Sequence, residues 1–189
     1  SKHVKDDERF FDFAFDMLCS LRKARRMEET LKMADAMFAK FQDENRRAKI
    51  LRETIELVYS DKNFPVAKIM AVVGKYDLSK VEGFNGFIIR YNPNVAWLID
   101  YCARFNCYVP HLVDASWQLR SKEWNEPEKI GERDKLLKKL KSIEPAILEG
   151  VKANSSNAVT YYRIAAYFPK TFFSDCVENA ETKKVSSKQ

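Results

Sequence analysis

The sequence predicts a mainly α-helical protein. A long N-terminal helix or helical hairpin is expected to precede a compact helical part, for which α+β stays open as an alternative. Three observations predict this class. Only five glycines and six prolines occur in 189 residues, so long helices meet few breakers. The first of these breakers is Pro65. Hydrophobic residues make up 46% and aromatic residues 13% of the chain, which is enough for a core and argues against disorder.

Residues 1–60 are expected to form an extended helical shaft. Apolar residues recur there at alternating steps of three and four, a period near that of helices packed lengthwise on one another. The larger members of this seam are Phe10, Phe13, Met17, Met27, Leu31, Phe38 and Phe41. The step fails at Asn45, so the helix either breaks there or changes its exposed face. A helix of roughly 35 residues would already be ~50 Å long, longer than a small body can cover. We therefore expect the seam to bind a protein partner or to mediate self-association.

The chain after the shaft is predicted to form a mainly helical domain over 61–177 and a disordered tail over 178–189. Residues 158–168 fit a helix or a strand, and both remain open. The other expected elements are, in order, a short apolar helix ending at Gly74, a β-strand between Gly86 and Pro93, apolar helices over 94–110 and 111–124, and a charged amphipathic helix closed by Pro145.

No catalytic motif stands out, so we expect a non-catalytic protein without a cofactor, although carboxylate sites built from distant residues stay open. Phosphate-binding glycine loops, paired histidines and nucleophile elbows are absent from the sequence. Cys102, Cys107 and His111 share the spacing C-x4-C-x3-H. On a continuous helix the two cysteines would lie roughly 140° apart, whereas zinc needs converging ligands. Burial of the cysteines is therefore favoured over a metal site.

Basic clusters suggest RNA as a partner. Each spans about two helical turns, so several of its members share a face and can meet consecutive phosphates. The two arginine-rich clusters are Arg22, Lys23, Arg25 and Arg26, then Arg46, Arg47, Lys49 and Arg52, and a third consists of Lys135, Lys138, Lys139 and Lys141. Nearby carboxylates such as Glu28, Asp43 and Glu53 favour the alternative of ordinary solvated helix faces. The net charge of +6 is spread along the chain, so it does not define a basic domain.

One family resemblance supports the RNA hypothesis. The stretch LKMADAMFAKFQDENRRAKI, residues 31–50, resembles the shaft of the coronavirus and nidovirus replicase subunit that serves as RNA-polymerase cofactor, also called primase-like. VDASWQLRSKEW and ANSSNAVTYYRIAA are similar to parts of that family's head. The resemblance covers only part of the chain. It implies a long helix that guides duplex RNA, with Arg22 to Arg26 and Arg46 to Arg52 on phosphates. It also implies an α/β head that contacts the polymerase and a small helical cofactor. The family's head is rich in strands, whereas residues 94–143 here have helical patterns.

The expected function is a non-catalytic RNA-binding accessory subunit of a viral RNA replication complex. Two alternatives stay open: a nucleocapsid-type protein that coats single-stranded RNA, and a helical protein–protein interaction module. Ser1 and Gln189 match what a 3C-like protease leaves on a polyprotein product. Four scattered cysteines and no signal-peptide pattern in the opening residues predict a cytoplasmic location, in the host cytoplasm if the protein is viral. Membrane insertion is not expected, because no apolar run approaches the ~18 residues needed.

Overall fold

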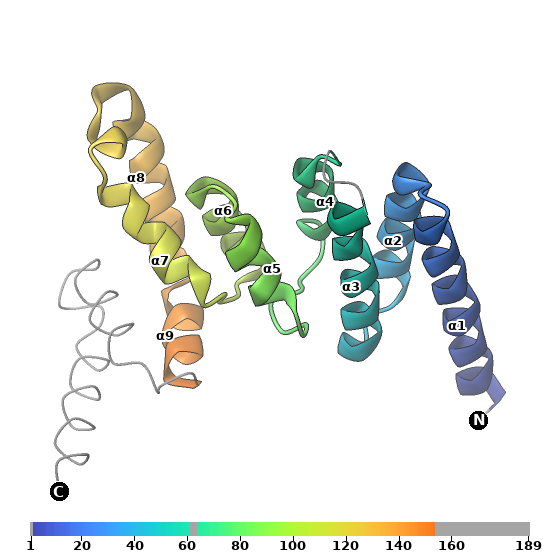
Figure 1. The fold of residues 1–189 in the computed structure, drawn as a ribbon. Helices are drawn as coiled ribbons and strands as arrows, with labels where there is room; N and C mark the ends of the chain where they lie inside the picture. Colours follow the sequence, from blue (N-terminus) through green and yellow to red (C-terminus); the bar gives the residue numbers. More distant parts are fainter. Residues whose placement is uncertain (1, 61–63, 154–189) are drawn as a thin grey trace, which may run out of the picture. The chain divides into compact units, whose positions relative to one another are not determined.

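The computed structural model describes residues 2–60 and 64–153, and over these residues it is all helical (Figure 1). This confirms the mainly α-helical class. The chain divides into two compact units between Tyr91 and Asn92, which we call unit 1 and unit 2. The elements are α1 Lys2–Lys23, α2 Met27–Lys40, α3 Glu44–Ser60, α4 Val66–Val73, α5 Phe84–Tyr91, α6 Val95–Phe105, α7 His111–Trp117, the 3-10 helices η1 Gln118–Arg120 and η2 Glu123–Asn125, α8 Pro127–Ser142 and α9 Glu144–Ala153.

The expected continuous shaft over residues 1–60 is wrong, because three helices that pack side by side occupy this segment (Figure 1). The helical hairpin, the other alternative, describes α1 and α2. The chain reverses after α1 at Arg25, whose φ is +57°. The backbone N–H of Arg26 donates to the Leu21 carbonyl, and that of Arg25 donates to the Arg22 carbonyl. These two bonds form a Schellman motif, which ends a helix with a left-handed residue.

A second reversal separates α2 from α3 close to the predicted break at Asn45. Phe41 ends α2 in an extended conformation. The Asp43 carboxylate then accepts a hydrogen bond from the Arg46 backbone N–H at 2.9 Å, as a helix N-cap does. Residues 31–50 therefore do not form one shaft, because α2 and α3 share them.

Unit 1 closes around apolar faces of α1, α2 and α3, together with α4 and α5. Leu18, Phe38 and Ile50 are fully buried, one from each of the three long helices. Short helix α4 ends at Gly74, as predicted. The Tyr76 hydroxyl, which follows α4, donates to the Asp35 carboxylate on α2 at 2.7 Å. Because α4 and α5 pack on α2 and α3, they belong to unit 1, and the boundary lies at residue 91, not at residue 60 as expected.

The predicted β-strand between Gly86 and Pro93 is wrong, because helix α5 covers Phe84–Tyr91. Phe84, Phe87 and Ile88 are buried while Ile89 is 53% exposed. Spacings of three and four residues place the buried side chains on one helical face, and a strand would have buried alternate residues instead. The apolar, β-branched composition hid this helical period.

Unit 2 is helical over residues 94–145 as predicted, but two helices are shorter than expected. Helix α6 ends at Phe105 and not at 110, and α7 ends at Trp117, where 3-10 helices replace the rest of the segment predicted up to 124. The Asn94 side chain accepts from the Trp97 backbone N–H at 2.8 Å and caps α6. Asn106 ends α6 with φ +47°, a conformation that asparagine tolerates. Pro145 does not close the charged helix as expected, because α8 ends at Ser142 and α9 begins at Glu144. Proline fits the first turn of α9, where its missing N–H has no intrahelical partner anyway.

The helix-or-strand prediction for 158–168 and the predicted tail over 178–189 lie outside the described residues. Among the helices that the structure describes, none has the length and apolarity to cross a membrane.

Candidate functional site

Helix α1 carries an exposed row of large apolar side chains. Phe10 is 50% exposed, Phe13 66% and Met17 44%. Over the described part of the chain, Ile89 and Ile130 are the only other large hydrophobic residues with comparable exposure. Because the three residues are three and four positions apart, they share one face of the helix. We call them the α1 stripe, and they belong to the set predicted to bind a partner.

A different face of α1 packs into unit 1. Phe11, Ala14 and Leu18 are buried at 3%, 3% and 0% exposure. They repeat the same spacing, one position further along the chain. The helix therefore has two adjacent apolar faces, and its own unit covers only one of them.

The remaining residues of the predicted partner-binding seam serve the core of unit 1. Leu31, Phe38 and Phe41 on and beside α2 are buried, and Met27 is half-buried. This corrects the prediction for these residues, since side chains already covered by their own unit are not free to meet a partner.

Cations surround the N-terminal end of the α1 stripe. The Lys40 ammonium lies 4.6 Å from the centre of the Phe10 ring. The Arg46 guanidinium lies 5.2 Å from the centre of the Phe11 ring and pairs with the Asp7 carboxylate at 2.5 Å. Such cation–π contacts at exposed sites are worth about 0.5–1 kcal/mol each. This end of the stripe is therefore aromatic, with Lys40 beside an exposed ring and Arg46 paired to a carboxylate.

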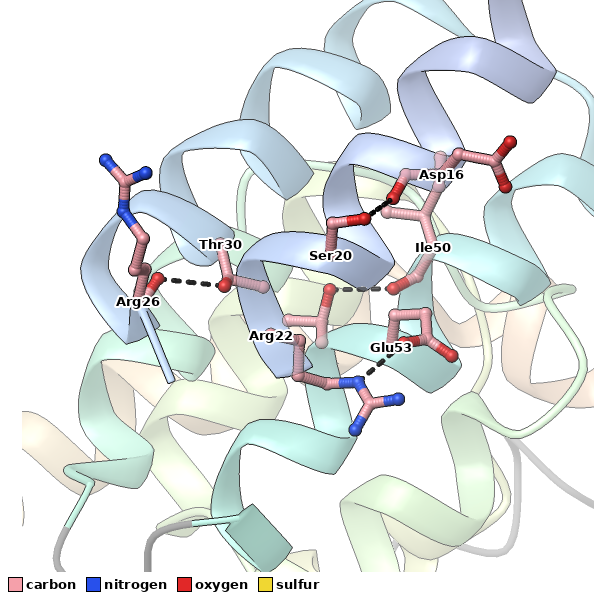
Figure 2. Close-up of polar contacts among 8 residues, drawn as sticks. Asp16, Ser20, Arg22, Arg26, Thr30, Ile50 and Glu53 are labelled. Atoms are coloured by element: carbon pink, nitrogen blue, oxygen red, sulfur yellow. Dashed lines mark hydrogen bonds and ion pairs between the residues drawn. The ribbon is translucent and has the colours of Figure 1, made fainter. Parts of the chain in front are cut away.

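In the first predicted RNA-binding cluster, two of the four cations form ion pairs within the protein. Arg22 pairs with Glu53 of α3 at 2.6 Å, and this contact ties α1 to α3 (Figure 2). The hydrogen bond to Glu53 raises the pKa of Arg22. Arg26 pairs with Glu29 on the surface. Lys23 and Arg25 are exposed, and among the described residues no hydrogen bond or ion pair engages their side chains.

The second predicted cluster includes a residue with a structural role. Arg47 is 8% exposed, and its guanidinium donates to four oxygen acceptors. The distances are 2.9 Å to the Phe41 carbonyl, 3.2 Å to the Phe38 carbonyl, 3.0 Å to the Asp77 carbonyl and 2.6 Å to Gln42 Oε1. It thus caps the C-terminal end of α2, where a cation is favoured, and holds the loop after α4. This corrects its assignment as an RNA contact.

Exposed cations from the two clusters do not form one track. Arg22 meets Glu53 near the C-terminal end of α1, while Arg46 meets Asp7 near its N-terminal end. Lys49 and Arg52 are the exposed members of the second cluster. A cavity of about 310 Å³ is lined by Arg52 together with Glu56 and Glu82, on an apolar wall that includes Leu51 and Ile55. Two carboxylates beside one arginine weaken the attraction for phosphate.

In unit 2, the predicted cysteines are buried and the predicted lysine cluster is partly paired. Cys102 and Cys107 are buried, which was the favoured expectation for them. His111 Nε2 lies 3.1 Å from Asn92 Oδ1. Over the part of the chain that the structure describes, no three potential metal ligands gather at one point. On α8, Lys139 pairs with Asp100 at 2.5 Å. Lys135, Lys138 and Lys141 are exposed.

Comparison with protein families, with curated proteins and with solved structures finds no match for this chain. The functional argument therefore rests on the α1 stripe and on the cations around it.

Proposed function

We propose that this protein is a non-catalytic interaction module that binds an amphipathic helix of a protein partner through the α1 stripe. The observation that carries the proposal is the exposure of Phe10, Phe13 and Met17 on one helical face. Contiguous exposed apolar residues mark interaction sites on soluble proteins, and phenylalanine and methionine are enriched in interface cores. A helix fits a straight row with this spacing, because apolar residues of a second helix can interdigitate with it.

The apolar area of the α1 stripe limits the affinity of such a contact. With about 200 Å² per large side chain, the measured exposures leave roughly 300 Å² of apolar surface. At ~25 cal/mol per Å² its burial contributes about 8 kcal/mol, against an association cost of ~4–15 kcal/mol. The apolar surface alone therefore gives weak binding, and polar contacts at its edge must select the partner.

A photo-crosslinking amino acid at position 13 tests the proposal. The matched control places the same group at position 89, because Ile89 is also an exposed large hydrophobic residue, at 53% against 66% for Phe13, but lies on α5. We expect position 13 to give a defined adduct in cells, whose protein component mass spectrometry identifies. The purified partner should then bind the wild type and Ile89→Glu but lose affinity for Phe13→Glu. Equal and unspecific labelling at both positions would remove the basis for the proposal.

RNA binding within an RNA-synthesis complex remains a second candidate. Two observations favour it: the exposed ring of Phe10 beside Lys40, and four exposed predicted cations, Lys23, Arg25, Lys49 and Arg52. Cations combined with aromatic stacking surfaces suit single-stranded nucleic acid. A duplex-guiding shaft receives less support, because α1, α2 and α3 are separate helices.

Fluorescence anisotropy with single-stranded and duplex RNA at two salt concentrations tests this candidate. The informative variants are Lys23→Glu/Arg25→Glu and Lys49→Glu/Arg52→Glu, because these side chains lie outside the ion pairs that join the helices. Binding through them should weaken steeply with salt in the wild type and drop in both variants. Unchanged affinity in both variants would rule these residues out as RNA contacts.

A further inference from the structure

We propose that the partner helix of the α1 stripe is α1 of a second copy of this chain, packed antiparallel across a twofold axis near Phe13. This inference rests on the proposed function, because it uses the same stripe. It adds the identity of the partner and the register of the contact.

The edge of the stripe carries two opposite charges at a matching spacing. Arg9 and Asp16 are both exposed. They are seven residues apart, two helical turns or ~10.5 Å, so they lie on the same edge of the stripe. No hydrogen bond or ion pair engages either side chain among the residues that the structure describes. In Figure 2 the Asp16 carboxylate lies apart from the contacts drawn, and only the backbone carbonyl of Asp16 accepts from Ser20.

The opposite edge of the stripe is closed by the unit itself. Ala14 and Leu18 lie on that side and are buried at 3% and 0% exposure. The charges at that edge are the cations Lys40, beside Phe10, and Arg46, beside Phe11. The edge with Arg9 and Asp16 is the one where a second copy of α1 finds exposed charges of both signs.

Antiparallel packing brings this charged edge against its own copy. When two identical helices pack antiparallel, the same edge of the stripe on each helix faces its counterpart on the other helix. When they pack parallel, each edge of one helix faces the opposite edge of the other helix. In the antiparallel register, Arg9 of each copy lies opposite Asp16 of the other, which gives two symmetric ion pairs. The same register places Phe10 of one copy between Phe13 and Met17 of the other. Parallel packing would set Arg9 against the edge that carries Lys40 and Arg46 beside Phe10 and Phe11, where it would meet like charges, so the charge pattern favours the antiparallel form.

The expected contact is small and reversible. Two copies of the stripe bury roughly 600 Å² of apolar surface, estimated as above, while stable interfaces bury about 1,200–2,000 Å² in total. The dimer should therefore form only at sufficient protein concentration. Changing the charges of Arg9 or Asp16 should measurably change its dissociation constant.

Sedimentation velocity of the full chain over a wide range of concentrations tests the proposal. We expect the wild type to shift from monomer to dimer. Arg9→Asp and Asp16→Arg should each raise the dissociation constant roughly tenfold, because both symmetric pairs become repulsive. The double variant Arg9→Asp/Asp16→Arg restores opposite charges and should recover most of the affinity. Lys32→Asp, an exposed charge reversal on α2, is the matched control and should dimerise like the wild type.

Two results would overturn this inference: a wild type that stays monomeric at every concentration, or a double variant as weak as either single variant. Circular dichroism of each variant checks that the helices persist. The crosslinking experiment at position 13 separates this failure from that of the proposed function. An adduct with another protein would leave the proposed function standing without the self-association. An adduct between two copies of this chain supports both.

Discussion

Replacing Arg47 with methionine distinguishes a structural role for this residue from the RNA contact that the sequence predicted. Methionine keeps much of the apolar stem of the side chain and removes the guanidinium. Its bonds to the carbonyls of Phe38 and Phe41 are buried, and those to the Asp77 carbonyl and Gln42 are partly buried. A buried acceptor left without a donor costs about 1–3 kcal/mol, whereas partly buried acceptors recover water. Two buried carbonyls therefore give an expected loss of about 3 kcal/mol in the free energy of unfolding.

Urea and thermal unfolding followed by circular dichroism measure this loss. For a unit of this size, about 3 kcal/mol lowers the midpoint temperature by roughly 15 °C. All three tryptophans, at positions 97, 117 and 124, lie in unit 2, so tryptophan fluorescence reports that unit for comparison. Arg52→Met is the matched control on the same helix, and because Arg52 is exposed it should change stability by less than about 0.5 kcal/mol. If Arg47→Met is as stable as this control, the structural role of the guanidinium is refuted.

Two further predictions concern unit 1. Arg25 has a left-handed backbone with φ +57°, which favours glycine, so Arg25→Gly should stabilise the protein by about 0.5–1 kcal/mol in urea unfolding. Arg25→Ala, which removes the charge but keeps the strain, should show no gain, and equal gains would mean that charge is responsible. Burial and the hydrogen bond to Asp35 raise the pKa of Tyr76 from 10.0 to about 12. Its contribution to stability is therefore full below pH 10 and is lost as the pH rises toward 12. Tyr76→Phe should lose that part of the alkaline decline, and an unchanged profile would contradict the assignment.

Residues 1–60 show what the sequence could predict and where it stopped. The alternating spacing correctly indicated helices. Its failure at Asn45 left a break or a change of exposed face open, and the structure has the break. The reversal at Arg25 was missed, because the usual signal for it is a glycine and this chain uses arginine there. The helix at Phe84–Tyr91 was missed for a related reason. Its β-branched and aromatic composition outweighed the spacing of Phe84, Phe87 and Ile88, although that spacing was the more reliable signal.

The candidate site was predicted in part. The sequence included Phe10, Phe13 and Met17 among partner-binding residues, and the structure leaves them exposed. The sequence placed Arg47 among the predicted phosphate contacts. In the structure its guanidinium is buried and donates to the backbone carbonyls of Phe41 and Phe38. The spacing of charges along a chain does not reveal which of them will find an acceptor elsewhere in the fold, because those acceptors come from distant segments. Asp77 is 30 residues from Arg47, and Asp7 is 39 residues from Arg46.

The sequence by itself determined that this protein is helical, because periodicity and the scarcity of breakers act locally along the chain. It also predicted the apolar seam that runs through Phe10, Phe13 and Met17, whereas the second apolar face with Phe11, Ala14 and Leu18 emerged from the structure. Only the tertiary structure decided which face is covered: α2 and α3 bury Phe11, Ala14 and Leu18 and leave the α1 stripe in solvent. The physical reason is that a helix of ~10 Å diameter meets its neighbours over a limited arc. The choice between two apolar faces of similar quality then depends on how the other helices pack, and no local pattern encodes that.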